Sequence, residues 1–434
     1  PGGASKWWLY HSLQSLSKTF AALGSPLVIC VGMPEQVLPK LARKYKAAAV
    51  FWNRSGTFAD GDDIAVKVAL KEAGIVPHIY SSTNYLIHFD DVVNSSGAPF
   101  KVFTPFYKRA SAAPAYRPLP APDTLIKPGN TLAGVPLESL ELLPKINWTA
   151  GLQAAWQPGE AGAKLRLEQF VENEMGDYND LRDYPAQAGT SKLSPHLHFG
   201  EITPGQILAV VSSWCESKRS SKLNFHAEAF TRQLYWREFG AYLLHYFPEM
   251  QHSPMRQEFE RFPWRNDGDI LKRWQRGKTG YPIVDAGMRE LWHTGWMHNR
   301  VRMIAASFLV KHLLQPWQSG AAWFWDTLVD ADAANNTLGW QWVSGCGPDA
   351  APYFRIFNPV LQGEKFDSKG EYIRRWIPEL ANMDTKYIHA PWTAPTEALH
   401  NAGVVLGKEY PKPIVDHKTA RQQALDAFAY IRNR

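Results

Sequence analysis

The chain has 434 residues, which is long for one hydrophobic core and favours two domains. Hydrophobic residues make up 45% and charged residues 20%, as in ordinary globular proteins, and no segment has the run of about 18 apolar residues that a membrane helix requires. The net charge of +6 suits a polyanionic partner such as nucleic acid and equally a basic enzyme with a small substrate.

The cysteines and the N-terminus indicate the compartment. Cys30, Cys215 and Cys346 are too few and too scattered for a disulfide framework, and they cannot supply all the thiolates of an iron–sulfur cluster. The first residues, 1–6, lack the ordered charged and apolar regions of a signal peptide. We therefore expect a cytoplasmic protein, and we also expect it to be a monomer.

The first third of the chain alternates strand-like and helix-like stretches. Apolar runs bounded by turn residues predict strands at 25–32, 47–52 and 76–80, with a turn at 53–56. Helical spacing predicts helices at 38–45 and 64–74. This alternation predicts a Rossmann-like parallel sheet in an α/β domain over residues 1–110. Because the pattern opens at a helix entrance at Gly2-Gly3, we expect the first strand or two of the sheet to be missing.

A linker and a helical region follow. Residues 112–128 are rich in proline and alanine, and 136–144 show no clear period, so we expect an interdomain linker over 111–160. From residue 161 helical patterns dominate, and we expect an all-α domain over 161–434. Its clearest helices are predicted at 163–174, 224–247, 285–314 with an interruption at 294–295, and 321–329.

The first segment that could carry chemistry runs from Tyr178 to Pro195. It contains Gly189-Thr190-Ser191 just before a predicted helix. Hydroxyls and free backbone N–H groups at such a turn suit a phosphate or diphosphate. A plain helix N-cap explains the same residues, and on this segment alone that reading is favoured.

The second segment lies in the long helix predicted at 224–247. Gln233, Trp236, Arg237 and Gly240 share one helical face and present an amide, an aromatic plate, a guanidinium and a gap. This face suits a pocket for a flat ligand. A buried face with one salt bridge is the alternative.

The third segment runs from Asp330 to Trp342 and on to Pro359. Asp330 and Asp332 are spaced as ligands of a hard cation often are. The calcium-loop pattern fails, because glycine is missing at its sixth position and no terminal glutamate follows. We therefore expect hydrogen bonding to a polar ligand and no metal.

Three motifs together resemble the flavin domain of the DNA photolyase and cryptochrome family, and most of all that of microbial class I-type cyclobutane pyrimidine dimer photolyases. The resemblance runs over about 165–431, and residues 2–109 resemble the family's antenna domain through 100–106. The motifs that carry it, in matching order and spacing, are 280–288, 296–303 and 330–359. The resemblance implies an all-α FAD-binding domain behind an α/β antenna domain.

The family binds FAD, and the resemblance assigns contacts residue by residue. Asn336 falls at the position that faces flavin N5. The implied FAD-binding residues are Tyr178, Thr190, Ser191, Leu193, Ser194, Arg237, Trp296, Arg302, Asp330, Asp332 and Asn336. The tryptophans that would feed electrons to the flavin are Trp264, Trp317 and Trp340.

The resemblance also implies a reaction. Light drives an electron from reduced FAD to a pyrimidine dimer flipped out of DNA, the ring opens, and the electron returns. Trp236 and Trp342 match positions that stack on the dimer, and Arg300 and Arg302 would reach phosphate or flavin. The implied lesion-pocket residues are Gln233, Trp236, Asn299, Met303 and Trp342.

One position departs from the dimer-photolyase pattern. Many dimer photolyases carry a glutamate where this chain has Gln233, and glutamine is also found there in animal-type cryptochromes and (6-4) photolyases. The (6-4) reaction wants a histidine acid, and only His298 is present in that stretch. The sequence therefore favours dimer repair. Two alternatives stay open. One is a blue-light receptor, whose relatives often append a signalling tail that we do not expect after Arg434. The other is a flavoprotein oxidoreductase with no role on DNA.

The antenna chromophore is the remaining expectation. Relatives use a folate, a deazaflavin or no second chromophore. Because the first strands are expected to be missing, we expect the antenna site to be damaged or empty, while FAD sits in the other domain.

Overall fold

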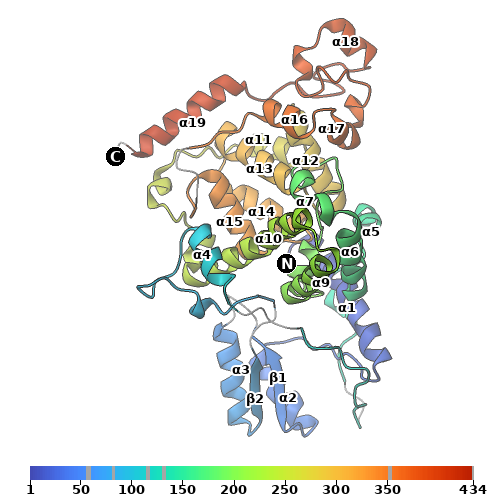
Figure 1. Cartoon of the computed structure of the whole chain (residues 1–434). Helices are drawn as coiled ribbons and strands as arrows, with labels where there is room; N and C mark the ends of the chain where they lie inside the picture. Colours follow the sequence, from blue (N-terminus) through green and yellow to red (C-terminus); the bar gives the residue numbers. More distant parts are fainter. Residues whose placement is uncertain (55–59, 81–83, 114–117, 130–132, 350–353, 433–434) are drawn as a thin grey trace.

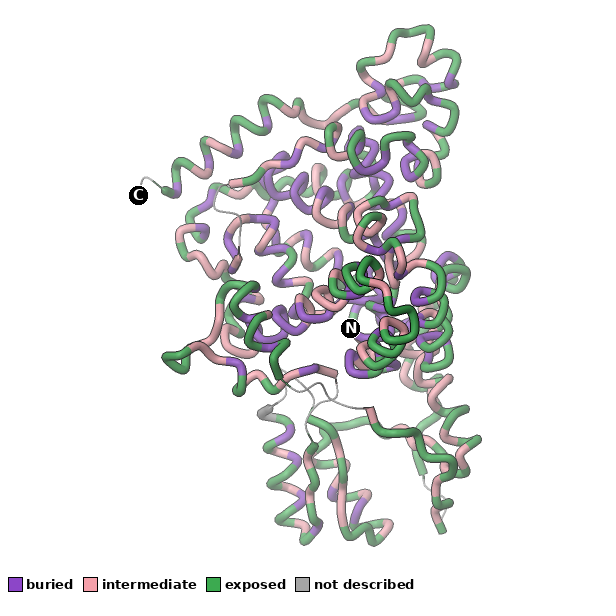
Figure 2. Tube along the Cα trace, viewed as in Figure 1, coloured by how far each residue is buried: buried purple, intermediate pink, exposed green. Residues whose placement is uncertain are grey.

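The computed structural model describes residues 1–434 apart from 55–59, 81–83, 114–117, 130–132, 350–353 and 433–434. Figure 1 shows a small α/β lobe beside a large helical body. The tube in Figure 2 is buried mainly through the centre of the body, whereas most of the lobe is exposed or half-buried. These two parts confirm the predicted fold class.

The lobe is a two-stranded parallel sheet with a helix before each strand. Ala49 lies opposite Val76, and the register continues to Asn53 opposite Tyr80. The elements are α2 (Pro34–Lys44), β1 (Ala49–Asn53), α3 (Asp60–Glu72) and β2 (Val76–Tyr80). The lobe has its own small core, formed by Ala42, Val66, Leu70 and Ile75. The helices predicted at 38–45 and 64–74 and the strands at 47–52 and 76–80 are therefore confirmed.

The strand predicted at 25–32 is wrong. This segment has no regular secondary structure, and Val31 is 68% exposed. Instead of a neighbouring strand it meets the linker, where the Ile29 carbonyl accepts a hydrogen bond from Val135 N at 2.8 Å. An apolar run becomes a strand only when another strand completes its hydrogen-bond ladder. The predicted turn at 53–56 lies partly outside the described residues.

Both ends of the N-terminal third pack on the helical body. In α1 (Gly3–Ala22), Trp7 and Trp8 are buried together with Val329 of the body. The Trp8 indole donates to Glu201 at 3.0 Å. At the other end, α4 (Phe103–Ala110) packs its phenylalanines against the long central helix. The chain therefore leaves the body after α1, forms the lobe, and contacts α10 again from Asn84 onward, ahead of α4 (Figure 1).

The body is built around the long helix α10, which confirms the helix predicted at 224–247. The Ser220 hydroxyl accepts from Leu223 N at the start of α10, and the helix ends before Pro248. The helices are α5 (Ala150–Ala155), α6 (Glu160–Asn173), α7 (Tyr178–Leu181), α8 (Ser194–His198), α9 (Pro204–Lys218), α10 (Ser221–Tyr246), α11 (Gly268–Gln275), α12 (Pro282–Thr294), α13 (Asn299–Ser307), α14 (Trp317–Thr327), α15 (Ala333–Ser344), α16 (Pro359–Phe366), α17 (Glu371–Trp376), α18 (Thr396–Asn401) and α19 (His417–Arg432).

Short turns connect these helices. Gly295, with a φ of +67°, ends α12 and so explains the interruption predicted at 294–295. The end of α13 continues as a π-helical turn, Phe308–His312. The 3-10 turns are η1 (Phe89–Asp91), η2 (Leu137–Leu140), η3 (Met175–Asp177), η4 (Pro248–Gln251), η5 (Gln257–Arg261), η7 (Pro378–Leu380) and η8 (Pro391–Thr393).

A buried carboxylate ties the start of α12 to the C-terminal segment. Asp285 accepts hydrogen bonds from the backbone N–H and the hydroxyl of Thr279, both at 2.7 Å. It also accepts from Gly280 N at 2.9 Å and from the Tyr410 hydroxyl at 2.7 Å. Asp285 and Tyr410 are 0% exposed. Burial raises the pKa of the Asp285 carboxyl, and these hydrogen bonds oppose that shift.

Candidate functional site

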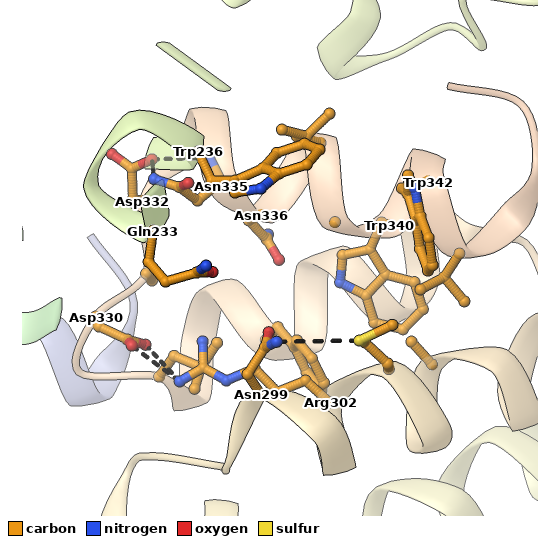
Figure 3. Close-up of a pocket in the computed structure, with 18 of the residues that line it drawn as sticks. Gln233, Trp236, Asn299, Arg302, Asp330, Asp332, Asn335, Asn336, Trp340 and Trp342 are labelled. Atoms are coloured by element: carbon orange, nitrogen blue, oxygen red, sulfur yellow. Dashed lines mark hydrogen bonds and ion pairs between the residues drawn. The ribbon is translucent and has the colours of Figure 1, made fainter. Parts of the chain in front are cut away.

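A cavity of about 400 Å³ opens in the body between α10, α13, α14 and α15. Its size falls within the range of small-molecule and cofactor sites. The lining residues are Arg182, Gln233, Trp236, Asn299, Arg302, Met303, Ala306, Phe324, Leu328, Asp330, Ala331, Asp332, Asn335, Asn336, Leu338, Gly339, Trp340, Trp342 and Val343. Figure 3 shows most of these side chains converging from separate helices.

Aromatic rings form much of the wall. The Trp236 ring stacks on Phe103 of α4, with centroids 3.7 Å apart and planes 8° apart. One face of Trp236 is thus covered by the N-terminal third, and this contact fixes the ring at the edge of the cavity. Trp342 lines the same cavity and donates its indole N–H to the Asp349 carbonyl at 3.1 Å.

Trp340 closes the cavity on the side of α14. Its ring is 2% exposed and packs against Trp274 and Phe324. A Cβ added at Gly320 would lie 2.0 Å from Trp340 Cη2, so only glycine leaves room for this ring. The Trp340 indole N–H is buried and has no hydrogen-bond partner among the described residues. Such an orphaned donor is uncommon in a protein interior.

An ion pair forms the polar edge of the cavity. The Arg302 guanidinium donates twice to Asp330, at 3.1 and 2.8 Å, and the Ser194 hydroxyl donates to the same carboxylate at 2.6 Å. The Asp330 side chain is 4% exposed and that of Arg302 is 24% exposed. Asp332 is the N-cap of α15, where it accepts from Asn335 N at 2.8 Å. Asp330 therefore holds Arg302, whereas Asp332 caps α15.

Amides line the floor between these groups. The Asn336 side-chain N–H donates to the Ala321 carbonyl at 3.0 Å, and its oxygen points toward the cavity in Figure 3. Asn299 lies 3.9 Å from the Met303 sulfur, one turn along α13. Gln233 donates to the Ala229 carbonyl of its own helix at 3.3 Å. These polar groups face a mainly aromatic wall, which suits a flat, polar-edged ligand.

The structure brings together all the predicted lesion-pocket residues, Gln233, Trp236, Asn299, Met303 and Trp342, at this one cavity. Among the predicted cofactor residues, Arg302, Asp330, Asp332 and Asn336 also line it. Those outside the lining are Tyr178, Thr190, Ser191, Leu193, Ser194, Arg237 and Trp296. Ser194 reaches the cavity only through its bond to Asp330.

Several predicted residues are engaged elsewhere. Arg237 donates to the Asn84 and Leu197 carbonyls, at 2.6 and 3.3 Å, and so fastens α10 to the chain that returns from the lobe. Arg300, predicted to reach DNA, pairs with Asp183 at 2.8 Å. Gly240, predicted as a gap, faces the start of α15, where an added Cβ would lie 3.4 Å from Asn335.

The remaining predicted residues are packed in the body. Trp296 is 8% exposed, with Lys192 and Arg302 over its ring. Tyr178 is buried against Phe170 and Phe230, and burial raises its pKa to about 12. Trp317 and Trp340 belong to one buried cluster, against which the half-buried Trp264 packs.

Two polar cavity residues were missed. Arg182 closes α7 and lines the cavity, although its segment was interpreted only as a phosphate site or a helix N-cap. Asn335 lines the cavity beside Asn336 and bonds to Asp332 at 2.6 Å. The spacing of Asn335 three residues after an N-cap aspartate could have placed it next to that carboxylate.

His298 gives a test of acid sensitivity. Burial, aided by the nearby Arg300 and Arg302, lowers its pKa from 6.5 to about 4. Between these values the unfolded chain binds more protons than the folded one, so stability falls as the pH drops through this window. His298→Asn keeps a side chain that can accept the N-cap bond from Arg300 N. In urea denaturation across this window, the variant should lose less stability than the parent, by up to about 3 kcal/mol. Parallel curves for the two proteins would contradict the assignment.

The described helices include none long and apolar enough to cross a membrane. The described residues also contain no group of three or more His, Cys, Asp or Glu side chains placed to hold a metal. The site is thus defined by aromatic rings, amides and one ion pair, within a two-part molecule made of an α/β lobe and a helical ligand-binding body.

Comparison with known proteins identifies the family to which this architecture belongs. Residues 230–430 match the FAD binding domain of DNA photolyase, and residues 1–123 match the DNA photolyase family model. The chain is 44% identical over 435 residues to a deoxyribodipyrimidine photo-lyase of Agrobacterium fabrum, covering 99% of this chain and 90% of that protein. The chain therefore belongs to the DNA photolyase and cryptochrome family.

Further similarities refine the class. A crystal structure of a bacterial class III photolyase from Agrobacterium tumefaciens has a TM-score of 0.96 and 44% identity, covering 100% of this chain and 89% of that one. Cryptochrome-2 of Arabidopsis thaliana is 38% identical, covering 100% of this chain and 72% of that protein. The predicted closeness to class I-type enzymes is therefore wrong. Short flavin-domain motifs, which photolyases and cryptochromes share, cannot separate such classes.

The residues present fit FAD. The cavity offers aromatic walls for a flat ring, amides at its floor and the guanidinium groups of Arg182 and Arg302 at its edge. The unpartnered Trp340 indole N–H lies in the same wall. The matched domain is the family's FAD-binding domain, so the predicted cofactor agrees with both the family and the cavity.

Proposed function

We propose that this protein is a light-driven DNA repair enzyme that splits cyclobutane pyrimidine dimers. The observation that carries the proposal is the convergence of all the predicted lesion-pocket residues, from α10, α13 and α15, on one cavity in a photolyase FAD-binding domain. Reduced FAD, when bound, supplies the light-driven electron. DNA containing the lesion is the proposed partner, and the protein is proposed to act as a cytoplasmic monomer.

The chain's own residues hold the substrate. Trp236 and Trp342 offer ring faces on which the flipped bases stack, and the Phe103 contact keeps Trp236 from rotating. Gln233 and Asn299 present amides that can donate to and accept from the base edges. The apolar wall excludes water, which strengthens these hydrogen bonds.

The geometry favours dimer repair over (6-4) repair. His298 does not line the cavity, and its lowered pKa keeps its ring neutral near pH 7. A histidine in that state is a poor acid for a lesion in the cavity. Light sensing is the second candidate, since the chain resembles a cryptochrome over its whole length.

One repair assay tests the proposal. The FAD-loaded, photoreduced protein is mixed with an oligonucleotide carrying one cyclobutane dimer, and the recovery of base absorbance is followed under blue light. Recovery that requires both light and reduced flavin supports repair and shows that Gln233 suffices. If base absorbance does not recover although the bound flavin can be reduced, the repair proposal is overturned. Gln233→Glu would then test whether the missing carboxyl group is the cause.

Trp317→Phe tests the proposed electron route. The variant should photoreduce oxidised FAD at least about tenfold more slowly, because phenylalanine is much harder to oxidise, while pre-reduced enzyme should repair at nearly the parental rate. Transient absorption measures the rate of photoreduction, and the repair assay measures the rate of repair. The matched control is Trp274→Phe, since Trp274 touches Trp340 but was not assigned to the route. Equal loss of photoreduction and repair in Trp317→Phe, or a block only in the control, would contradict the assignment.

The domain boundaries and antenna remain proposals. We propose an antenna domain over 1–110, a linker over 111–160 and a catalytic domain over 161–434, with α1 and α4 serving as its contacts to the body. We further propose that the antenna site is damaged or empty. A stoichiometric folate or deazaflavin in the purified protein would contradict this last point.

A further inference from the structure

A second hollow lies on the other side of α14 from the flavin cavity. Its volume is about 830 Å³, and it shares no lining residue with the first cavity. Adjacent residues of α14 separate the two, since Trp323 lines the second hollow and Phe324 the first. The lining residues are Lys272, Gln275, Arg276, Lys278, Met288, Arg289, Trp292, His293, Trp323, Arg375, Trp376 and Pro378. We refer to this hollow as the α14 groove.

A ladder of tryptophans borders the α14 groove. Trp292 and Trp323 stack with centroids 5.8 Å apart and planes only 4° apart. Trp148 continues the ladder, 6.5 Å from Trp292 at an angle of 21°. Trp292 nevertheless stays 61% exposed and Trp148 stays 41% exposed. Large rings held parallel yet open to solvent form a stacking platform rather than a core.

Cations surround this platform. Lys272, Arg276, Lys278 and Arg375 are exposed around the groove. Arg276 and Lys278 have no carboxylate within ion-pair distance among the described residues. Arg289 pairs with Glu379 at 2.7 Å and Lys272 pairs with Asp269 at 3.8 Å, so the surplus positive charge of the groove comes from Arg276, Lys278 and Arg375. A partner for this surface must therefore be anionic as well as aromatic.

We propose that the α14 groove binds single-stranded nucleic acid. Bases would stack on the exposed Trp292, and the phosphates between them would contact Arg276 and Lys278. Aromatic rings and unpaired cations in one groove suit the bases and the phosphates of a strand. An acidic protein segment would use the cations but leave the tryptophan ladder without a partner. The inference does not depend on dimer repair, because the groove and the flavin cavity are built from different residues.

Binding of a fluorescein-labelled, undamaged thymine oligonucleotide to the FAD-loaded protein in the dark tests this proposal by fluorescence anisotropy. Trp292→Ala should weaken binding about tenfold, and Trp292→Phe should restore part of it. Arg276→Ala combined with Lys278→Ala should weaken binding. The double variant should also lower the salt dependence, by about one unit of log–log slope for each phosphate that is no longer neutralised.

The matched controls are Trp325→Ala, a 38% exposed ring of the same helix outside the groove, and Lys386→Ala, an exposed lysine elsewhere. Both should bind as the parent does. Dimer repair by Trp292→Ala should also be parental, which separates a failure here from a failure of the repair proposal. No measurable binding by the parent, equal binding by the groove variants, or equal affinity for thymidine monophosphate and the oligonucleotide would overturn the proposal.

Discussion

The Asp330→Asn variant is expected to lose most of its FAD and about 2–4 kcal/mol of its free energy of unfolding. Asp330 is the only carboxylate bonded to Arg302 among the described residues, and it also accepts from Ser194. An asparagine places an N–H where one of these donors now points. It thus leaves a largely buried guanidinium without its counter-charge, and only weaker contacts, a hydrogen bond to the Met297 carbonyl and the Trp296 ring, still hold Arg302 among the described residues.

Two measurements distinguish the loss of stability from the loss of FAD. Urea denaturation of the FAD-free protein reports the change in stability, and the ratio of flavin to protein absorbance reports cofactor retention. Asp332→Asn is the matched control for stability, because asparagine caps a helix as well as aspartate does. Parental stability and flavin content in Asp330→Asn would show that the ion pair does not organise the cavity.

Asp285→Ala is expected to destabilise the protein by at least about 3 kcal/mol, although Asp285 does not line the cavity. The substitution strands the N–H groups of Thr279 and Gly280 and the hydroxyl of Tyr410 inside the protein. Each buried donor left without an acceptor costs about 1–3 kcal/mol. Thermal and urea denaturation should show the loss, with the flavin spectrum of the folded fraction unchanged.

Tyr410→Phe provides a graded comparison. It removes one donor and leaves the Asp285 carboxylate bonded to Thr279 and Gly280, so we expect a loss of about 1 kcal/mol. If Asp285→Ala were no more destabilising than Tyr410→Phe, the carboxylate could not be the point that joins α12 to the C-terminal segment.

Local patterns predicted several helices, though not α1, α9, α15 or α19, because residues near their ends mark them. Ser220 and Pro248 bound α10, and Gly295 ends α12, so these limits can be recognised without any knowledge of the fold. The strand predicted at 25–32 failed for the opposite reason. Its apolar run is real, but whether it pairs depends on a neighbour that no local pattern identifies.

Only part of the site could be predicted, and that part came from the resemblance to the family. Helical spacing placed Gln233 and Trp236 together, and both line the cavity, whereas Arg237 turns to the Asn84 carbonyl. The Phe103 stack on Trp236 joins residues far apart in the sequence and could not be inferred from either segment. The α14 groove was missed likewise, because Trp148, Trp292 and Trp323 become neighbours only after folding.

The way α1 and α4 pack on the body makes the lobe an insertion. Its core, formed by Ala42, Val66, Leu70 and Ile75, contains no residue of the body, while Trp8 and Phe103 on either side are fixed in the body's core. The lobe can therefore melt as a separate cooperative unit without releasing either anchor. When the lobe refolds, its two ends are already held in place by α1 and α4. Most of the entropy cost of bringing these ends together has therefore been met before the lobe folds.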